Sequence, residues 1–206
     1  MIAWLTAHSH MARCDDDLIV LDAARDAYLQ IPDPGRALQP GAGGLLTGPE
    51  DILTALAAEG LVSRRGPAPR RPLPPQPTAP HPAIVSWRLP LDVWRVLAAV
   101  RGPVASQGDI PTVSPSRRVA AVADSARTAS VIATYQGMLP FITPQGECLW
   151  RARLLGAALA RSGVKADWVF GVKTWPFAAH CWLQIGPYAL DDDPDRIGLY
   201  TPIMAV

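Results

Sequence analysis

The stretch Gly146-Glu147-Cys148-Leu149-Trp150-Arg151-Ala152-Arg153-Leu154-Leu155 places a cysteine at the start of an expected helix. At helical spacing, one face of that helix holds four residues: Cys148, Ala152, Leu155 and Leu159. The Cys148 side chain is therefore expected at the first turn, on the side that packs against the rest of the protein. Because a helix N-terminus lowers the pKa of a thiol, Cys148 is either a candidate nucleophile or a small core residue.

An imidazole follows this thiol along the chain. His180 lies in the apolar run 180–185, which predicts a strand. Alternation along that strand puts Trp182 and Gln184 on the same face as His180. Cys181 falls on the opposite face, so we expect it to point away from the imidazole and into the core. A thiol, an imidazole and a carboxylate are the groups that a catalytic triad needs.

The carboxylate is ambiguous, because three aspartates follow one another: Asp191, Asp192 and Asp193. A two-residue turn at 186–187 pairs Ile185 with Tyr188, and the same register places Asp193 opposite His180. A three-residue turn at 185–187 places Asp192 there. A slip of one residue moves every side chain to the other face of a strand. The residues alone therefore leave the choice between these carboxylates open.

Composition and charge limit the classes of protein that fit. The chain has 206 residues, 49% hydrophobic and 18% charged, as expected of a globular protein. Its net charge of +1 favours neither nucleic acid nor an anionic membrane as a partner. Residues 1–10 lack the features of a secretory signal, and no apolar run approaches the roughly 18 residues of a membrane span. We therefore expect a cytoplasmic protein.

Cysteine and histidine usage indicates neither a disulfide framework nor a metal site. The three cysteines have no tight spacing. His8, His10 and Cys14 lack a fourth ligand at a matching spacing, so we expect no metal there. Nothing else in the sequence indicates a cofactor.

Residues 1–65 are predicted to form a small winged-helix-like domain. Three runs of residues that favour β structure predict its strands: 2–5, 18–21 and 27–31. The Gly/Ala-rich segment 35–47 is interpreted as a loosely formed helix or a loop. A helix follows, capped by Thr47 or Gly48 and closed by Gly60.

Residues 66–82 form a predicted linker, and residues 83–206 a second domain. Eight of the seventeen linker residues are proline, which favours an extended, semi-stiff spacer over a ligand for an adaptor domain. The second domain begins with helical patterns over 89–100 and 116–138 and continues with the helix at Cys148. Strands are predicted at 168–172 and 180–185. The fold class is therefore α+β.

Several motifs of the second domain occur in order at the spacing of one known family: Cys148-Leu149-x-Arg151, Val169-Phe170-Gly171-Val172, Pro176-Phe177-x-Ala179-His180-x-Trp182, Asp191-Asp192-x-Pro194 and Tyr200-Thr201-Pro202-Ile203. Over residues 140–203 the chain resembles the lasso peptide biosynthesis B proteins. These are transglutaminase-like (papain-like) cysteine peptidases that remove the leader from a lasso peptide precursor. The first domain resembles the PqqD-like RiPP recognition element, which binds that leader.

The resemblance implies roles for particular residues. The nucleophile of the family falls on Cys148, its base on His180 and its acid on Asp192. The family often has a small residue where Cys181 stands, which implies that this thiol has no function. Helix position makes the backbone N–H of Cys148 one oxyanion donor, and Gln145 is our candidate for a second.

The resemblance also implies partners. We expect the leader peptide to add as a strand beside residues 27–31, with the helix at 49–59 as the other wall. The contact residues expected on these elements are Ala27, Tyr28, Leu29, Ile31, Leu53 and Leu56. A separate asparagine-synthetase-like lasso cyclase would then use the freed amine of the core peptide to close a macrolactam.

Three other classes of protein compete with this interpretation. A transglutaminase-like acyltransferase would use the same three groups with an amine in place of water. A non-catalytic adaptor would bind the leader and carry an inert thiol. A winged-helix DNA-binding regulator would need a basic recognition helix, which the chain lacks.

Overall fold

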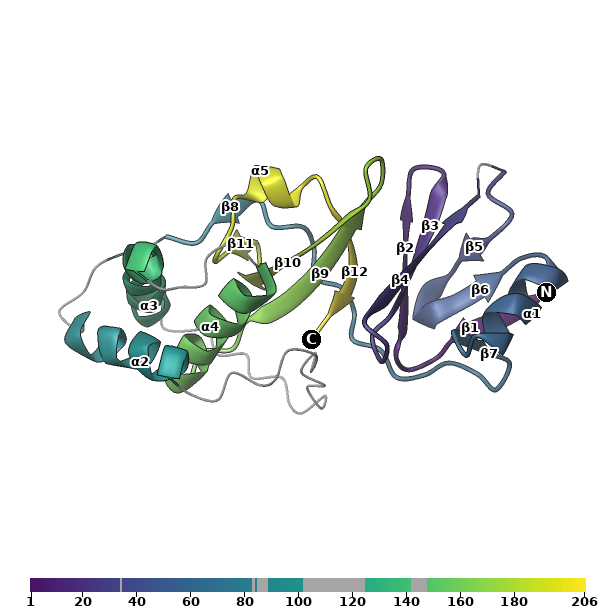
Figure 1. Ribbon diagram of the computed structural model, residues 1–206. Coiled ribbons are helices and arrows are strands. Elements are labelled where there is room, and N and C mark those ends of the chain that lie inside the picture. Colours follow the sequence, from purple (N-terminus) through teal and green to yellow (C-terminus); the bar gives the residue numbers. More distant parts are fainter. Residues whose placement is uncertain (34, 83, 85–88, 102–124, 142–147) are drawn as a thin grey trace. The chain divides into compact units, whose positions relative to one another are not determined.

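The computed structural model describes residues 1–33, 35–82, 84, 89–101, 125–141 and 148–206 (Figure 1). Its contacts divide the chain into two compact units. The first unit consists of Met1–Leu73, Gly171–Ala179 and Tyr200–Ala205, and the second of Pro74–Phe170, His180–Leu199 and Val206. Compactness alone does not test the predicted domain borders at residues 66 and 83, which stay predictions.

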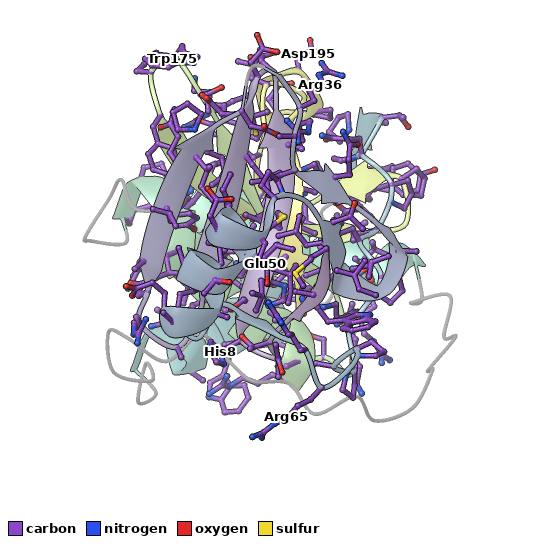
Figure 2. All side chains as sticks on the ribbon, turned by 90° about the vertical axis from the view of Figure 1, so that its right-hand side faces the viewer. His8, Arg36, Glu50, Arg65, Trp175 and Asp195 are labelled. Carbon is purple, nitrogen blue, oxygen red and sulfur yellow. The ribbon has the colours of Figure 1, made fainter. Side chains whose placement is uncertain are left out.

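The first unit contains two antiparallel sheets and one α-helix (Figure 1). One sheet has the order β5-β6-β1-β7, formed by Gln39–Pro40, Leu45–Thr47, Ile2–Leu5 and Val62–Ser63. The other has the order β2-β3-β4, formed by Ser9–Cys14, Asp17–Asp22 and Ala27–Pro32. Helix α1 spans Glu50–Ala58, and its first turn carries the exposed Glu50 (Figure 2). Its inner side packs on apolar residues of both sheets, among them Leu5, Leu18 and Leu46.

The three strands predicted in this unit are confirmed, but strand β2 was missed. Polar residues in Ser9–Cys14 hid its pattern, although Ala12 and Cys14 are buried. The helix-or-loop prediction for 35–47 is wrong at residues 39–40 and 45–47, which form strands. That segment forms strand β5, a 3-10 turn (η1, Ala42–Gly44) and strand β6, which pairs with β1. Its Gly43 and Gly44 take positive φ of 67° and 80°, which glycine adopts readily and which turns the chain back on itself.

The predicted boundaries of helix α1 are half right. Pro49 stands at the cap position without a side-chain cap bond, so neither Thr47 nor Gly48 is the cap. Gly60 follows the helix with a φ of +76°, as a helix-terminating glycine does.

The second unit carries the helices that the sequence predicts there. Helices α2 (Leu89–Arg101), α3 (Ser125–Met138) and α4 (Cys148–Arg161) pack on one another, and a 3-10 turn (η2, Leu139–Phe141) follows α3. The N-terminal part of the predicted helix 116–138 lies outside the described residues. A short helix α5 spans Pro194–Ile197.

A five-stranded sheet in the order β12-β9-β10-β11-β8 accompanies these helices. Its strands are Thr201–Ala205, Asp167–Lys173, Ala178–Ile185, Tyr188–Ala189 and Ala79–Pro80. The predicted strands at 168–172 and 180–185 are confirmed as β9 and β10. A Cβ added to Gly156 of α4 would lie 3.7 Å from Leu183 Cδ1, so α4 packs on the face of β10 that carries Leu183.

The proline-rich segment 66–82 contains no helix and one short strand, β8, and each of its ends is bonded within a folded unit. In the first unit the Arg70 guanidinium donates to the carbonyls of Ser9 at 2.6 Å and Thr6 at 2.5 Å. In the second unit, strand β8 pairs in parallel with β11, and His81 N donates to Ala189 O at 2.7 Å. Proline residues restrict the backbone, and these bonds hold the two ends of the segment as well. Among the residues described, no helix is long and apolar enough to cross a membrane.

Candidate active site

Cys148 is the first residue of helix α4, as the sequence predicts. The residues on its helical face, Ala152, Leu155 and Leu159, are all buried, which confirms the direction of the apolar stripe. Cys148 itself is half-buried. The thiol therefore lies at the helix N-terminus, where the helix dipole favours a negative charge.

His180 and Asp192 are joined by a short hydrogen bond. His180 Nε2 lies 2.6 Å from Asp192 Oδ2, and both side chains are at most 10% exposed. Burial would raise the pKa of Asp192, but the bond from His180, the N–H of Asp193 and the charge of Arg196 hold it below its ordinary value. Since Asp192 engages Nε2, the ring nitrogen that remains for the thiol is Nδ1.

Cys148 is hydrogen-bonded to two residues of strand β10. The bond from the Cys181 thiol does most to lower the pKa of Cys148, to about 4, against the opposing effect of burial. A bond from the His180 ring and one from the backbone N–H of Cys181 act in the same direction. Burial would lower the pKa of His180, but its bonds to Asp192 and Cys148 raise it to about 9. At neutral pH these shifts favour a thiolate beside an imidazolium.

Cys181 is the residue of this site that sequence reasoning missed. It is buried, as expected, and lies on the face of β10 opposite to His180 and Trp182, whose rings stack at 6.2 Å. That opposite face is the one on which α4 packs, so the Cys181 thiol meets Cys148. The bond to Cys148 and burial together raise the pKa of Cys181, which therefore remains a neutral donor. The strand alternation was the available signal, but it does not say which helix covers each face.

The turn between β10 and β11 has the two-residue form, with Ile185 paired to Tyr188 and Gln184 to Ala189. Extending this register to His180 gives Asp193 as its partner, and that extension is wrong because the ladder stops first. Asp193 instead caps α5, where its Oδ1 accepts from Asp195 N at 2.9 Å. The structure brings Asp192 to the imidazole.

The other predicted site residues are distributed as follows. Gln145, the candidate second oxyanion donor, lies outside the described residues. Ala27, Tyr28, Leu29 and Ile31 lie on β4, an edge strand of its sheet, and Leu29 is 41% exposed. Leu53 and Leu56 are only 2% and 4% exposed, because they face the core of the first unit. A wall for a peptide would therefore have to come from the outer residues of α1.

His8 and Cys14 near the N-terminus have structural contacts of their own. His8 Nε2 lies 4.0 Å from Asp22, and Cys14 Sγ donates to Val172 O at 3.7 Å. Among the residues that the structure describes, no group of three or more His, Cys, Asp or Glu side chains is placed to hold a metal ion.

A thiol at a helix start, a strand imidazole and a carboxylate that engages the far ring nitrogen form the type of site that papain-like cysteine proteases use. The comparison with family models agrees with this class. Residues 89–205, more than half of the chain, match the model of the transglutaminase-like superfamily, and the chain belongs to that superfamily. Its members generally have cysteine-protease-like catalysis. No curated protein and no solved structure matches the chain.

Proposed function

We propose that the protein is a cysteine peptidase that binds and removes the leader peptide of a lasso peptide precursor. Cys148 is the nucleophile, His180 the general acid and base, and Asp192 the group that orients the imidazole. The observation that carries this proposal is the 2.6 Å bond that Asp192 Oδ2 accepts from His180 Nε2, together with the bond between Cys148 and the same imidazole. An ionised thiol next to a protonated base is the resting state such an enzyme needs.

The reaction proceeds through an acyl-enzyme. The Cys148 thiolate attacks the carbonyl carbon at the leader–core junction, and the backbone N–H of Cys148, with Gln145 as the proposed second donor, stabilises the oxyanion. The C–N bond breaks as His180 gives its proton to the leaving amine of the core peptide. Water then attacks the thioester, His180 takes the proton of that water, and the leader leaves with a free carboxylate. The core amine is the group that a lasso cyclase of the asparagine-synthetase type would use to close the macrolactam.

Recognition of the leader is assigned to the outer edge of strand β4. Among the residues that the structure describes, this strand pairs with β3 alone, and the side chains of Tyr28, Leu29 and Ile31 are not buried. A peptide that adds as a strand would satisfy backbone groups along this edge and place alternate side chains against these residues. Both precursor and protein would meet in the cytoplasm, with no nucleic acid or membrane involved.

An acyltransferase that passes the leader to an amine is the second candidate. Membership of the transglutaminase-like superfamily supports it equally, because both reactions share the thioester. The masses of the products separate them: hydrolysis adds water to the leader, whereas transfer adds the amine. A non-catalytic adaptor is disfavoured by the bonds that lower the pKa of Cys148.

The test uses the full chain and its precursor peptide, followed by mass spectrometry. The wild-type protein should release leader and core, and Cys148→Ala should bind the precursor but release neither. Cys14→Ala is the matched control, since it removes a buried thiol of the first unit. Full cleavage by Cys148→Ala would refute the assignment of the nucleophile.

A further inference from the structure

The ladder between β10 and β11 breaks at an unusual place. Leu190 N donates to Leu183 O at 3.0 Å, which continues the register of the turn. In a regular antiparallel ladder, such a pair also exchanges a bond from Leu183 N to the carbonyl of Leu190. Here Leu183 N donates to Asp191 Oδ1 at 2.8 Å. A side-chain oxygen therefore stands where a strand would present a backbone carbonyl.

Both the side chain and the main chain of Asp191 are fixed in this position. Its side chain is buried, and its main-chain carbonyl accepts from Arg151 Nη2 of helix α4 at 2.8 Å. The carbonyl of Arg151 accepts in turn from Tyr135 of α3 at 3.1 Å. The peptide of Asp191 is thus directed toward α4 instead of continuing along β10.

The consequence appears at the next two residues. Had the ladder continued, Asp193 would have stood opposite His180. With the chain diverted at Asp191, Asp192 Oδ2 meets His180 Nε2 at 2.6 Å, and Asp193 caps α5. The backbone N–H of Cys181, on the same strand edge as that of Leu183, is left for Cys148.

We propose that Asp191 is a positioning residue of the active site: its bond to the backbone of Leu183 ends the ladder and brings Asp192 onto the imidazole of His180. This effect on the ladder depends on the position of the acceptor oxygen of Asp191 and not on its negative charge. An N–H donor needs an acceptor at the correct distance, which an amide oxygen supplies as well as a carboxylate does. This inference rests on the roles proposed for Cys148, His180 and Asp192.

The charged and titratable groups that face Asp191 support a role without charge. They are Arg151 from α4, Tyr135 from α3, His180 and Cys181 from β10, and the neighbouring Asp192. Burial raises the pKa of Asp191 to about 7, against the opposing effects of the Leu183 N–H and Arg151. The site therefore tolerates the neutral form of this group.

Two variants separate geometry from charge in the full-length protein. Asp191→Asn keeps an oxygen at the same distance from Cα and removes the charge, whereas Asp191→Glu keeps the charge and displaces it by one methylene. The readout is the rate at which iodoacetamide alkylates Cys148, followed peptide by peptide from acid to alkaline pH. Asp191→Asn should keep the wild-type profile. In Asp191→Glu the midpoint of the profile should rise by about one pH unit, because loss of the Asp192 contact raises the pKa of Cys148 by about that much, so alkylation near pH 5 should be about twofold slower.

Amide hydrogen exchange at Leu183 provides a readout that does not depend on catalysis. The amide should stay protected in Asp191→Asn and exchange faster in Asp191→Glu. Asp195→Asn is the matched control, because Asp195 is an exposed carboxylate near the same loop and points outward (Figure 2). Circular dichroism checks that each variant is folded. If the longer side chain of Asp191→Glu prevents folding, Asp191→Ala replaces it as the variant that lacks the bond to Leu183 N.

The outcomes distinguish this inference from the proposed function. A wild-type Cys148 that alkylates no faster than Cys14 would refute the proposed function, while exchange at Leu183 would still test Asp191. Wild-type behaviour of both Asp191→Glu and Asp191→Ala would overturn the positioning role. If Asp191→Asn is folded but its Cys148 is alkylated as slowly as in Asp191→Glu, the charge of Asp191 is what acts. That result would also overturn the positioning role.

Discussion

Replacing Asp192 by asparagine removes the charge that faces His180 and leaves an oxygen that still accepts a bond from Nε2. The contact is 2.6 Å long, and the Asp192 side chain is only 10% exposed, so solvent screens it little. A hydrogen bond to a charged partner contributes about 1.5–3 kcal/mol, which corresponds to about one to two pH units in the pKa of the imidazole. The bonds to Asp192 and Cys148 raise the pKa of His180 to about 9. In Asp192→Asn we expect that pKa to fall to about 7–8.

The pKa of His180 is measured by NMR titration of protein with labelled histidine. The chain has 4 histidines, and His180→Ala identifies the signal that belongs to His180. Asp193→Asn is the matched control, since it removes the adjacent, exposed carboxylate that caps α5. The alkaline limit of precursor cleavage should move to lower pH by the same amount as the pKa. An unchanged His180 pKa in Asp192→Asn, or an equal fall in Asp193→Asn, would refute this account of the imidazole.

Three further predictions concern groups around the site and in the core. Cys181→Ala removes a hydrogen bond to a charged group and should raise the pKa of Cys148 by up to about two units, which slows its alkylation near pH 5 by up to about tenfold. Cys181→Ser, which keeps a donor, should slow it less, and equal rates in both variants would contradict a donor role. The raised pKa of Asp191 means that its neutral form stabilises the fold, and that this contribution is lost as pH rises from about 4 to about 7. Asp191→Asn should therefore raise the melting temperature relative to wild type at pH 8 more than at pH 5, and a pH-independent difference would speak against it. Leu53→Ala should cost about 2–5 kcal/mol in chemical denaturation, because Leu53 is 2% exposed in the core, with precursor affinity of the folded protein unchanged; lost affinity at normal stability would restore Leu53 to the leader-binding surface.

Local sequence signals were sufficient to predict an element wherever the spacing of its apolar residues matches its secondary structure. The start of α4 at Cys148 follows from the breakers before it and from the spacing of Ala152 and Leu155, which are fully buried. The two strands within 35–47 were missed for the opposite reason. The glycines and alanines of this segment carry almost no local preference, and pairing of Leu45–Thr47 with β1 decides its structure. That pairing depends on residues some forty positions away, which no short window of sequence contains.

The three consecutive aspartates show where periodicity stops being informative. Counting from the two-residue turn correctly predicts the pairs nearest to it, and alternation correctly places Cys181 opposite to His180. Both rules assume that every rung of a ladder is made by backbone groups. At Leu183 the backbone N–H donates to a carboxylate instead of a backbone carbonyl. Each residue after Asp191 is therefore displaced from the position that counting residues from the turn assigns. The displacement gives the three aspartates three environments: Asp191 is buried on a backbone amide, Asp192 engages the imidazole, and Asp193 caps a helix. Identical side chains in adjacent positions thus acquire different chemistry from the one place where the strand pairing ends.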